Sequence, residues 1–117
     1  MDKNEAVKTI IHQCDDEDGF LVQLRSWRSF QQDKYRELIN AIKAYRDAIA
    51  NQSTIERKVA GSLHTLVTIL GDMIEIFPRN ERERGQIESA LAECWELVEE
   101  LFTPTLSKER HSLSRSF

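Results

Sequence analysis

Arg57 and His64 are the residues of this 117-residue chain whose types and spacing could best support chemistry. An arginine can stabilise the charge of a phosphate, and a histidine can transfer a proton near neutral pH. Six residues separate the two, so on a helix they would lie on the same side, about two turns apart. The ordinary alternative is a pair of solvated residues on a polar helix face, and we favour it.

The spacing of Arg57 and His64 resembles the short arginine-to-histidine signature of HEPN-type ribonucleases, which are also small helical bundles. In that family the arginine stabilises phosphate charge and the histidine acts in acid–base chemistry. The resemblance implies a metal-independent ribonuclease with these two residues as its catalytic pair. It covers two residues only, and Lys58 follows the arginine where a small polar residue is common in the family.

The acidic run that ends at Gly19 is a second candidate site, because carboxylates spaced along a loop can bind calcium. Asp16, Asp18 and Gly19 match three positions of an EF-hand loop. Cys14, however, stands where the loop needs its first oxygen ligand, and Arg25 stands where it needs a bidentate glutamate. We therefore interpret the run as an acidic turn whose charge suits the N-terminus of the following helix.

A zinc site would require at least three of His12, Cys14, His64 and Cys94 to converge. Both cysteines fall in apolar helical patterns, which predicts buried thiols, so we expect no metal and no cofactor. Reduced cysteines, together with a polar N-terminus, favour a cytoplasmic protein. No apolar stretch approaches about 18 residues, so we expect no membrane span.

Basic and aromatic residues alternate over residues 25–36. These residue types stack on nucleobases, and they are also enriched at protein interfaces. The chain as a whole has a formal net charge of −4, so it offers no general basic field to a nucleic acid. A nucleic-acid-binding accessory protein that uses residues 25–36 is therefore a third hypothesis, which we do not favour.

Helices must position all of these residues. The chain is 40% hydrophobic and 31% charged with only four Gly and two Pro, which excludes low-complexity disorder and argues against an all-β fold. Apolar residues recur at helical spacing in four segments, 4–14, 20–50, 54–77 and 81–103. We predict an all-α, up-and-down bundle of three long helices plus a short N-terminal helix. This domain covers residues 1–103, and a flexible, basic, Ser-rich tail covers 104–117.

The segment 20–50 is predicted to be one helix of about 46 Å. Its apolar stripe continues at spacings of three and four residues through Trp27 and Tyr35, with Gln31 as the polar gap. A break near Gln31 is the alternative.

Two capping patterns mark the helices that follow. Ser53 with Glu56 precedes the third helix, and Asn80 with Glu83 precedes the last. Pro78 ends the third helix.

The stripes also predict which side chains are buried. Trp95 and Phe102, one heptad apart on the edge of the last stripe, should be only partly buried and could contact another chain. The glutamates of the same helix should form weak ion pairs with Lys43 and Arg46. Almost complete burial is expected for Leu38, Ile42, Leu63, Leu66, Leu70, Leu91 and Val98.

The start of the helix 20–50 would overhang its shorter neighbours and expose a large apolar cluster. A second copy could cover that cluster, which predicts a homodimer; a heterologous protein partner is the alternative. The leading functional hypothesis is a non-enzymatic, self-associating protein–protein interaction module that serves as an adaptor, assembly subunit or inhibitor. The predicted interface residues are Phe20, Leu24, Trp27, Phe30, Gln31, Trp95 and Phe102.

Overall fold

Five helices form a four-membered bundle in which the first two helices together take one place. The structure, a computed structural model, describes residues 1–102; the predicted tail 104–117 lies outside the described residues. The helices are α1 (Lys3–Asp15), α2 (Phe20–Trp27), α3 (Gln32–Ala48), α4 (Arg57–Ile76) and α5 (Glu81–Phe102). The predicted all-α bundle is confirmed.

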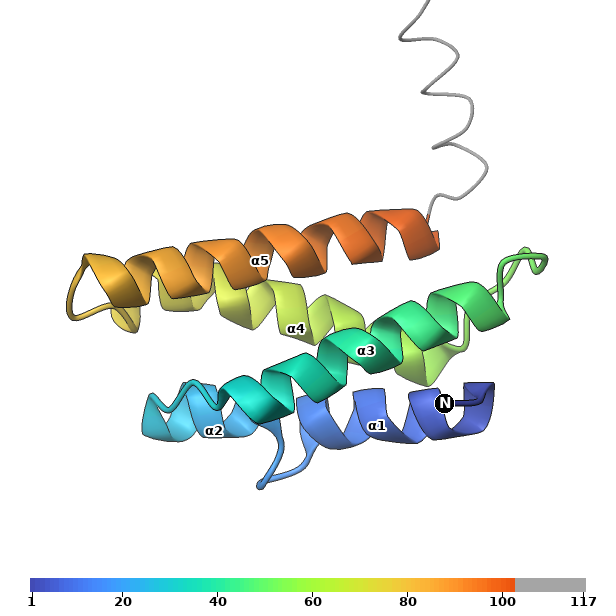
Figure 1. Cartoon of the computed structure of the whole chain (residues 1–117), viewed down its shortest axis with the longest axis horizontal. Helices are drawn as coiled ribbons and strands as arrows, with labels where there is room; N and C mark the ends of the chain where they lie inside the picture. Colours follow the sequence, from blue (N-terminus) through green and yellow to red (C-terminus); the bar gives the residue numbers. More distant parts are fainter. Residues whose placement is uncertain (103–117) are drawn as a thin grey trace, which may run out of the picture.

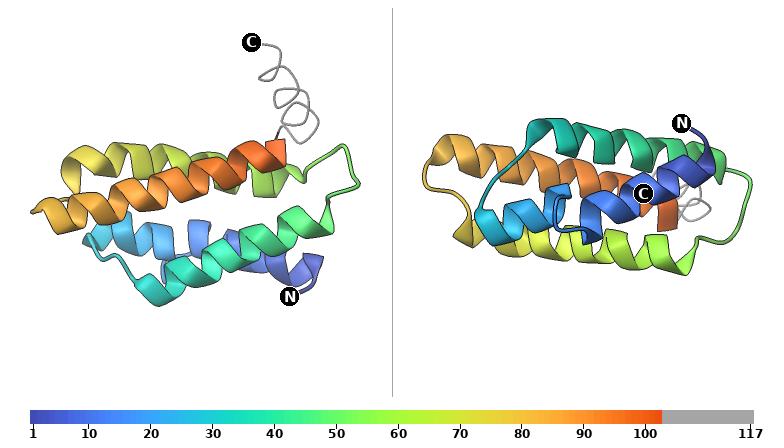
Figure 2. Two further views of the ribbon diagram at one scale, coloured as in Figure 1. Left: turned by 45° about the horizontal axis from the view of Figure 1, so that its top comes forward. Right: turned by 90° about the horizontal axis from the view of Figure 1, so that it is seen from below.

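The helices are arranged as a ring (Figures 1 and 2). The α1–α2 rod packs on α3 and on α4, and α5 packs on the same two helices from the opposite side. The α1–α2 rod and α5 are thus diagonally opposite each other across the core. Short connections between α3, α4 and α5 make consecutive helices antiparallel, as the up-and-down prediction requires.

The prediction of one continuous helix over 20–50 was wrong. The α2 helix ends at Trp27, the backbone of Arg28 turns into the left-handed region at φ 52°, and α3 runs back in the opposite direction. The N–H groups of Arg28 and Ser29 donate to the carbonyl of Gln23, which closes the last turn of α2. Because the chain reverses here, the expected overhang does not form.

The apolar residues of α2 are therefore covered within the chain. Phe20 and Leu24 are completely buried, and Phe20 packs edge-to-face on Phe30 with ring centroids 5.0 Å apart. Tyr35 of α3 completes this aromatic cluster, 5.2 Å from Phe20 and 5.3 Å from Phe30. Trp27, which the stripe placed toward the core, is instead 73% exposed.

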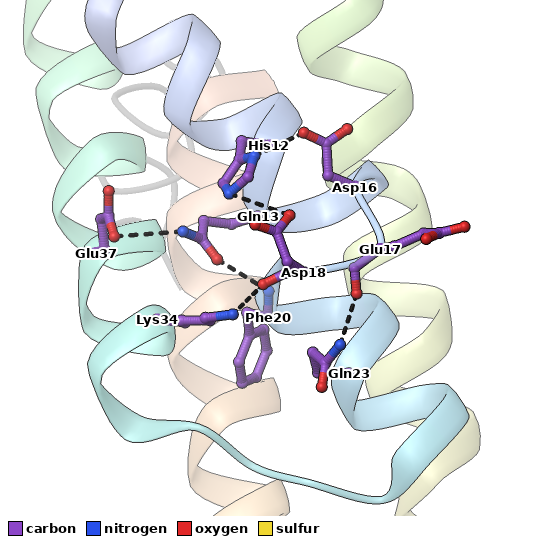
Figure 3. Close-up of polar contacts among 9 residues, drawn as sticks. All are labelled: His12, Gln13, Asp16, Glu17, Asp18, Phe20, Gln23, Lys34 and Glu37. Atoms are coloured by element: carbon purple, nitrogen blue, oxygen red, sulfur yellow. Dashed lines mark hydrogen bonds and ion pairs between the residues drawn. The ribbon is translucent and has the colours of Figure 1, made fainter.

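The turn between α1 and α2 is held by the buried side chain of Gln13 (Figure 3). Its Oε1 accepts a 2.9 Å hydrogen bond from the N–H of Phe20, which opens α2. Its Nε2 donates at 3.3 Å to the carboxylate of Glu37 on α3. Gly19 lies so close to the end of α1 that a Cβ atom there would be 2.2 Å from the carbonyl oxygen of His12. This turn therefore requires glycine for space.

The two predicted capping patterns have different outcomes. Asn80 caps α5 as predicted, because its Oδ1 accepts a 2.9 Å hydrogen bond from the N–H of Glu83. The Ser53 pattern was wrong: α4 begins at Arg57, and its N-cap is Glu56 without a side-chain hydrogen bond. The N–H of Glu56 donates instead to the hydroxyl of Tyr45, a buried residue of α3 whose oxygen needs a partner.

The predicted core is confirmed except at one residue. Leu38, Ile42, Leu63, Leu66 and Leu70 are completely buried, and Val98 is buried. Leu91 is only half-buried, because the buried side of α5 is centred near Ile87 and Cys94 and Leu91 lies at its edge.

By length and composition alone, α4 would be long and apolar enough to cross a membrane. This is weak evidence, because core helices of bundles satisfy the same criteria and the apolar side of α4 is packed on α1 and α5.

Candidate functional site

The largest exposed apolar feature of α5 is a pair of aromatic side chains. Trp95 is 54% exposed and Phe102 is 42% exposed. They lie seven residues apart, so they occupy the same side of the helix about two turns from each other. The half-buried Leu91 lies on the same side, one turn before Trp95. We call Leu91, Trp95 and Phe102 the α5 outer stripe.

The α5 outer stripe lies across the helix from the side that contacts α3. On that other side the hydroxyl of Tyr35 donates to the carboxylate of Glu93 at 2.6 Å. Arg46 pairs with Glu100 at 2.8 Å. Two residues correspond to about 200° around a helix, so Trp95 and Phe102 point away from these two contacts.

The charge of α5 is strongly acidic around the stripe. The helix contains seven glutamates and only two arginines, both near its start. Glu88 pairs with Arg84 at 4.0 Å, and both side chains are about half exposed. Glu96, next to Trp95, is exposed and forms no ion pair with another residue of the described chain. The stripe is therefore an apolar strip edged by carboxylates.

The predicted ion pairs between α5 and α3 are confirmed at one position. Arg46 reaches Glu100, and this contact raises the pKa of the Arg46 guanidinium. Lys43 is exposed, and no ion pair joins it to a glutamate within the part of the chain that the structure describes.

The predicted interface residues of α2 and the following connection are placed differently. Phe20 and Leu24 are inaccessible, and Phe30 is half-buried against Phe20. Gln31 is half-buried as well and donates to the side-chain oxygen of Gln23 at 3.3 Å. Of that cluster only Trp27 presents a large apolar surface. The spacing of apolar residues did not predict this burial, because that spacing continues unchanged through the break between α2 and α3.

Arg57 and His64 are both exposed on the outer side of α4. Within the described chain neither side chain has a hydrogen bond or an ion pair that would fix its position. General acid–base catalysis depends on a proton donor or acceptor held at a defined position. The geometry therefore favours the solvated-pair interpretation over the ribonuclease alternative.

The basic and aromatic residues of 25–36 do not form one face. Arg25 and Arg28 are exposed near the end of α2, whereas Phe30 packs on the core. The ammonium of Lys34 donates to the backbone carbonyl of Asp18 (Figure 3). The reversal at Arg28 separates the α2 residues from those of α3, which weakens the nucleic-acid hypothesis.

A cluster of His12, Asp16 and Asp18 was missed in the sequence. One potential ligand atom from each lies within 4.8 Å of the others, so the three could offer ligands to a metal ion. The imidazole already joins the two carboxylates: Nδ1 is 2.6 Å from Asp16 and Nε2 is 3.6 Å from Asp18 (Figure 3). A histidine in the last turn of α1 also complements the helix dipole. The feature of the sequence that could have predicted this cluster is the four-residue spacing of His12 and Asp16, which puts both on the same side of the end of α1.

The two cysteines are free and buried. Burial raises the pKa of the Cys94 thiol to about 12, and it also raises the pKa of Cys14. Neither thiol is therefore activated as a nucleophile near neutral pH, because the nucleophile is the thiolate. They act as small core residues.

Comparison of this chain with models of protein families, with curated protein sequences and with solved structures finds no match.

Proposed function

We propose that this chain is a non-enzymatic protein–protein interaction module that binds its partner through the α5 outer stripe. The observation that carries the proposal is the exposure of Trp95 and Phe102 on one side of one helix. Aromatic side chains contribute most when a partner covers them completely, and they are enriched at the centres of protein interfaces. Each buries a large apolar area, worth about 25 cal/mol per Å².

The structure changes which partner we propose. A homodimer was expected from an exposed apolar cluster on α2, but Phe20 and Leu24 are covered within one chain. We therefore propose a heterologous protein partner, and a second copy becomes the alternative. Light scattering at micromolar concentration separates the two: the isolated chain should have the monomer mass of 13.6 kDa.

A cytoplasmic location remains part of this proposal. Its support is the pair of free cysteines in the core, because disulfides are rare in reducing compartments.

Photo-crosslinking tests the proposed surface directly. A photoreactive residue at Ala92, which is exposed beside the α5 outer stripe, should capture a protein of defined mass in the cells that make this chain. The substitution Trp95→Ser should abolish that product. The same photoreactive residue at Thr68, exposed on α4, is the matched control and should not give it.

Two results would contradict the proposed function. One is a product of equal yield from both positions. The other is a product from Ala92 that Trp95→Ser leaves unchanged.

A further inference from the structure

Near the α5 outer stripe, Glu88 and Glu96 form no close ion pair with another residue of the part of the chain that the structure describes. Arg46 of α3 engages Glu100, and Tyr35 of α3 engages Glu93, on the side of α5 that faces the bundle. Neither group reaches the stripe itself. Beside the stripe, Glu88 has only a 4.0 Å exposed pairing with Arg84, which is worth little in water.

Glu96 adds a carboxylate directly after Trp95 in the sequence, about 100° farther round the helix. Its side chain is exposed and has no ion-pair partner in the described part of the chain. The net charge of α5 is −5, from seven glutamates and two arginines, and both arginines lie at the end farthest from Phe102. A partner that brings cations to these carboxylates would remove the repulsion as it covers the aromatic rings.

The shape of the stripe fits another helix. Leu91, Trp95 and Phe102 are spaced by four and then seven residues, which is the spacing of a helix–helix seam. The seam is about 17 Å long, or three helical turns. An amphipathic helix presents apolar side chains at matching intervals and can place basic residues along both edges of its apolar face.

A second copy of the chain fits the same stripe poorly. A two-fold contact through α5 would bring two helices of charge −5 side by side. The arginines that could compensate, Arg82 and Arg84, lie near the start of the helix, away from Trp95 and Phe102. Like charges brought together across an interface oppose association.

We infer that the partner segment bound by the α5 outer stripe is a basic amphipathic helix, an inference that rests on the proposed function. The apolar face of that helix covers Trp95 and Phe102. Its lysines or arginines lie against Glu88 and Glu96.

The full chain with Trp27→Phe provides the assay, because the sequence has two tryptophans and Trp95 is then the only one. The probe is a synthetic amphipathic peptide about three heptads long, with leucine at the seam positions and lysine elsewhere. A matched peptide carries glutamate in place of lysine. Binding of the lysine peptide should shift the emission of Trp95 to shorter wavelength. It should be at least about tenfold tighter than that of the glutamate peptide and should weaken as salt rises.

Charge reversal locates the binding surface. The double substitution Glu88→Lys and Glu96→Lys should weaken binding of the lysine peptide by at least about tenfold. The matched control is Glu5→Lys with Glu17→Lys, which makes the same change in net charge on the α1 side of the bundle, diagonally opposite α5. The control should change affinity by less than about threefold.

Three results would overturn the inference. The first is equal affinity for the two peptides, and the second is an equal loss in the two double variants. The third is a shift of Trp95 emission, without peptide, when Lys108, Arg110 and Arg115 are replaced by glutamate. That shift would identify the basic C-terminal segment of the chain itself as the occupant.

The proposed function and this inference can fail separately. If Trp95→Ser abolishes the crosslink from Ala92 but the two peptides bind equally, the interaction surface stands and the basic partner is wrong. If Trp95→Ser leaves the crosslink unchanged and neither peptide alters Trp95 emission, both are wrong.

Discussion

The hydroxyl of Tyr35 on α3 donates a 2.6 Å hydrogen bond to the carboxylate of Glu93 on α5. Tyr35 is buried and Glu93 is half-buried, so this is a charge-assisted bond in a partly desolvated place. Burial raises the pKa of the tyrosine, and the adjacent Cys94 and Glu93 raise it further. The phenol therefore stays a donor at neutral pH, and together with the Arg46–Glu100 ion pair it joins α3 to α5.

Removing this bond should destabilise the bundle. Tyr35→Phe is expected to lower the free energy of unfolding by about 1–3 kcal/mol, because the Glu93 carboxylate loses its donor while remaining half-buried. Urea denaturation followed by circular dichroism measures the change. Tyr45→Phe is the control: its hydroxyl accepts only from the N–H of Glu56 in the loop before α4, so its loss should be smaller. An unchanged urea midpoint for Tyr35→Phe would contradict the contribution assigned to the Tyr35–Glu93 hydrogen bond.

Glycine substitutions should have opposite effects at two positions. Gly19→Ala places a Cβ 2.2 Å from the carbonyl oxygen of His12 and 2.9 Å from the Cα of Gln13, and backbone atoms cannot move aside. A loss of about 1–3 kcal/mol is expected. Gly61→Ala on α4 has nothing within 4 Å, so the better helix propensity of alanine should add up to about 1 kcal/mol. Thermal unfolding of both variants tests the pair. An unchanged stability of Gly19→Ala would contradict the geometry of the α1–α2 turn, and a loss at Gly61→Ala would contradict the open space at that position.

The reversal of the chain at Arg28 allows a second matched pair of substitutions. Arg28 has φ 52°, where glycine is favoured over residues with a Cβ. Arg28→Gly should raise the free energy of unfolding by about 0.5–1 kcal/mol. Arg25→Gly, three residues earlier inside α2, should lower it by about the same amount, because glycine is a poor helix former. Equal destabilisation by the two substitutions would show that the helix does not end where the structure places its end.

The buried thiols predict a loss of stability in alkali. Burial raises the pKa of Cys94 from 9.0 to about 12 and raises that of Cys14 in the same direction. Below pH 9 both the folded and the unfolded chain keep these protons, so their contribution is constant. Above pH 9 the thiols of the unfolded chain lose their protons before those of the folded chain. The free energy of unfolding therefore falls with rising pH, by up to about 1.4 kcal/mol per pH unit for each thiol.

Unfolding in urea between about pH 8 and pH 10 measures this slope. The double variant Cys14→Ala with Cys94→Ala should have a flatter profile over the same range. An identical slope in both proteins would mean that the thiols are not the groups responsible.

Much of α3, α4 and α5 could be predicted because local signals agreed with one another. The apolar stripe of α4 predicted Leu63, Leu66 and Leu70 as core residues, and all three are buried. Asn80 predicted the start of α5 because a capping side chain acts within one turn of its own position. At Ser53 the same kind of signal failed, because the hydroxyl of Tyr45, eleven residues from Glu56, satisfies the free N–H instead.

The candidate surface was predictable only in part. The spacing of Trp95 and Phe102 put both on the edge of the last stripe, and they are indeed exposed. Phe20 and Leu24 have the same kind of spacing but are buried, because α2 is enclosed by α1, α4 and the reversed α3. Periodicity specifies which residues share a side of a helix. It does not specify what covers that side.

The sequence by itself determined the all-α class, the apolar sides of the long helices and the acidic character of α5, because these depend on residue type and on spacing within a few turns. Only the tertiary structure decided that the chain reverses at Arg28. The stripe through Trp27, Gln31 and Tyr35 has unbroken spacing, so no local pattern distinguishes a straight helix from two antiparallel ones. Reversal is favoured because it buries Phe20 and Leu24 and lets α3 pack along α1. The free energy of those contacts depends on segments far apart in the chain.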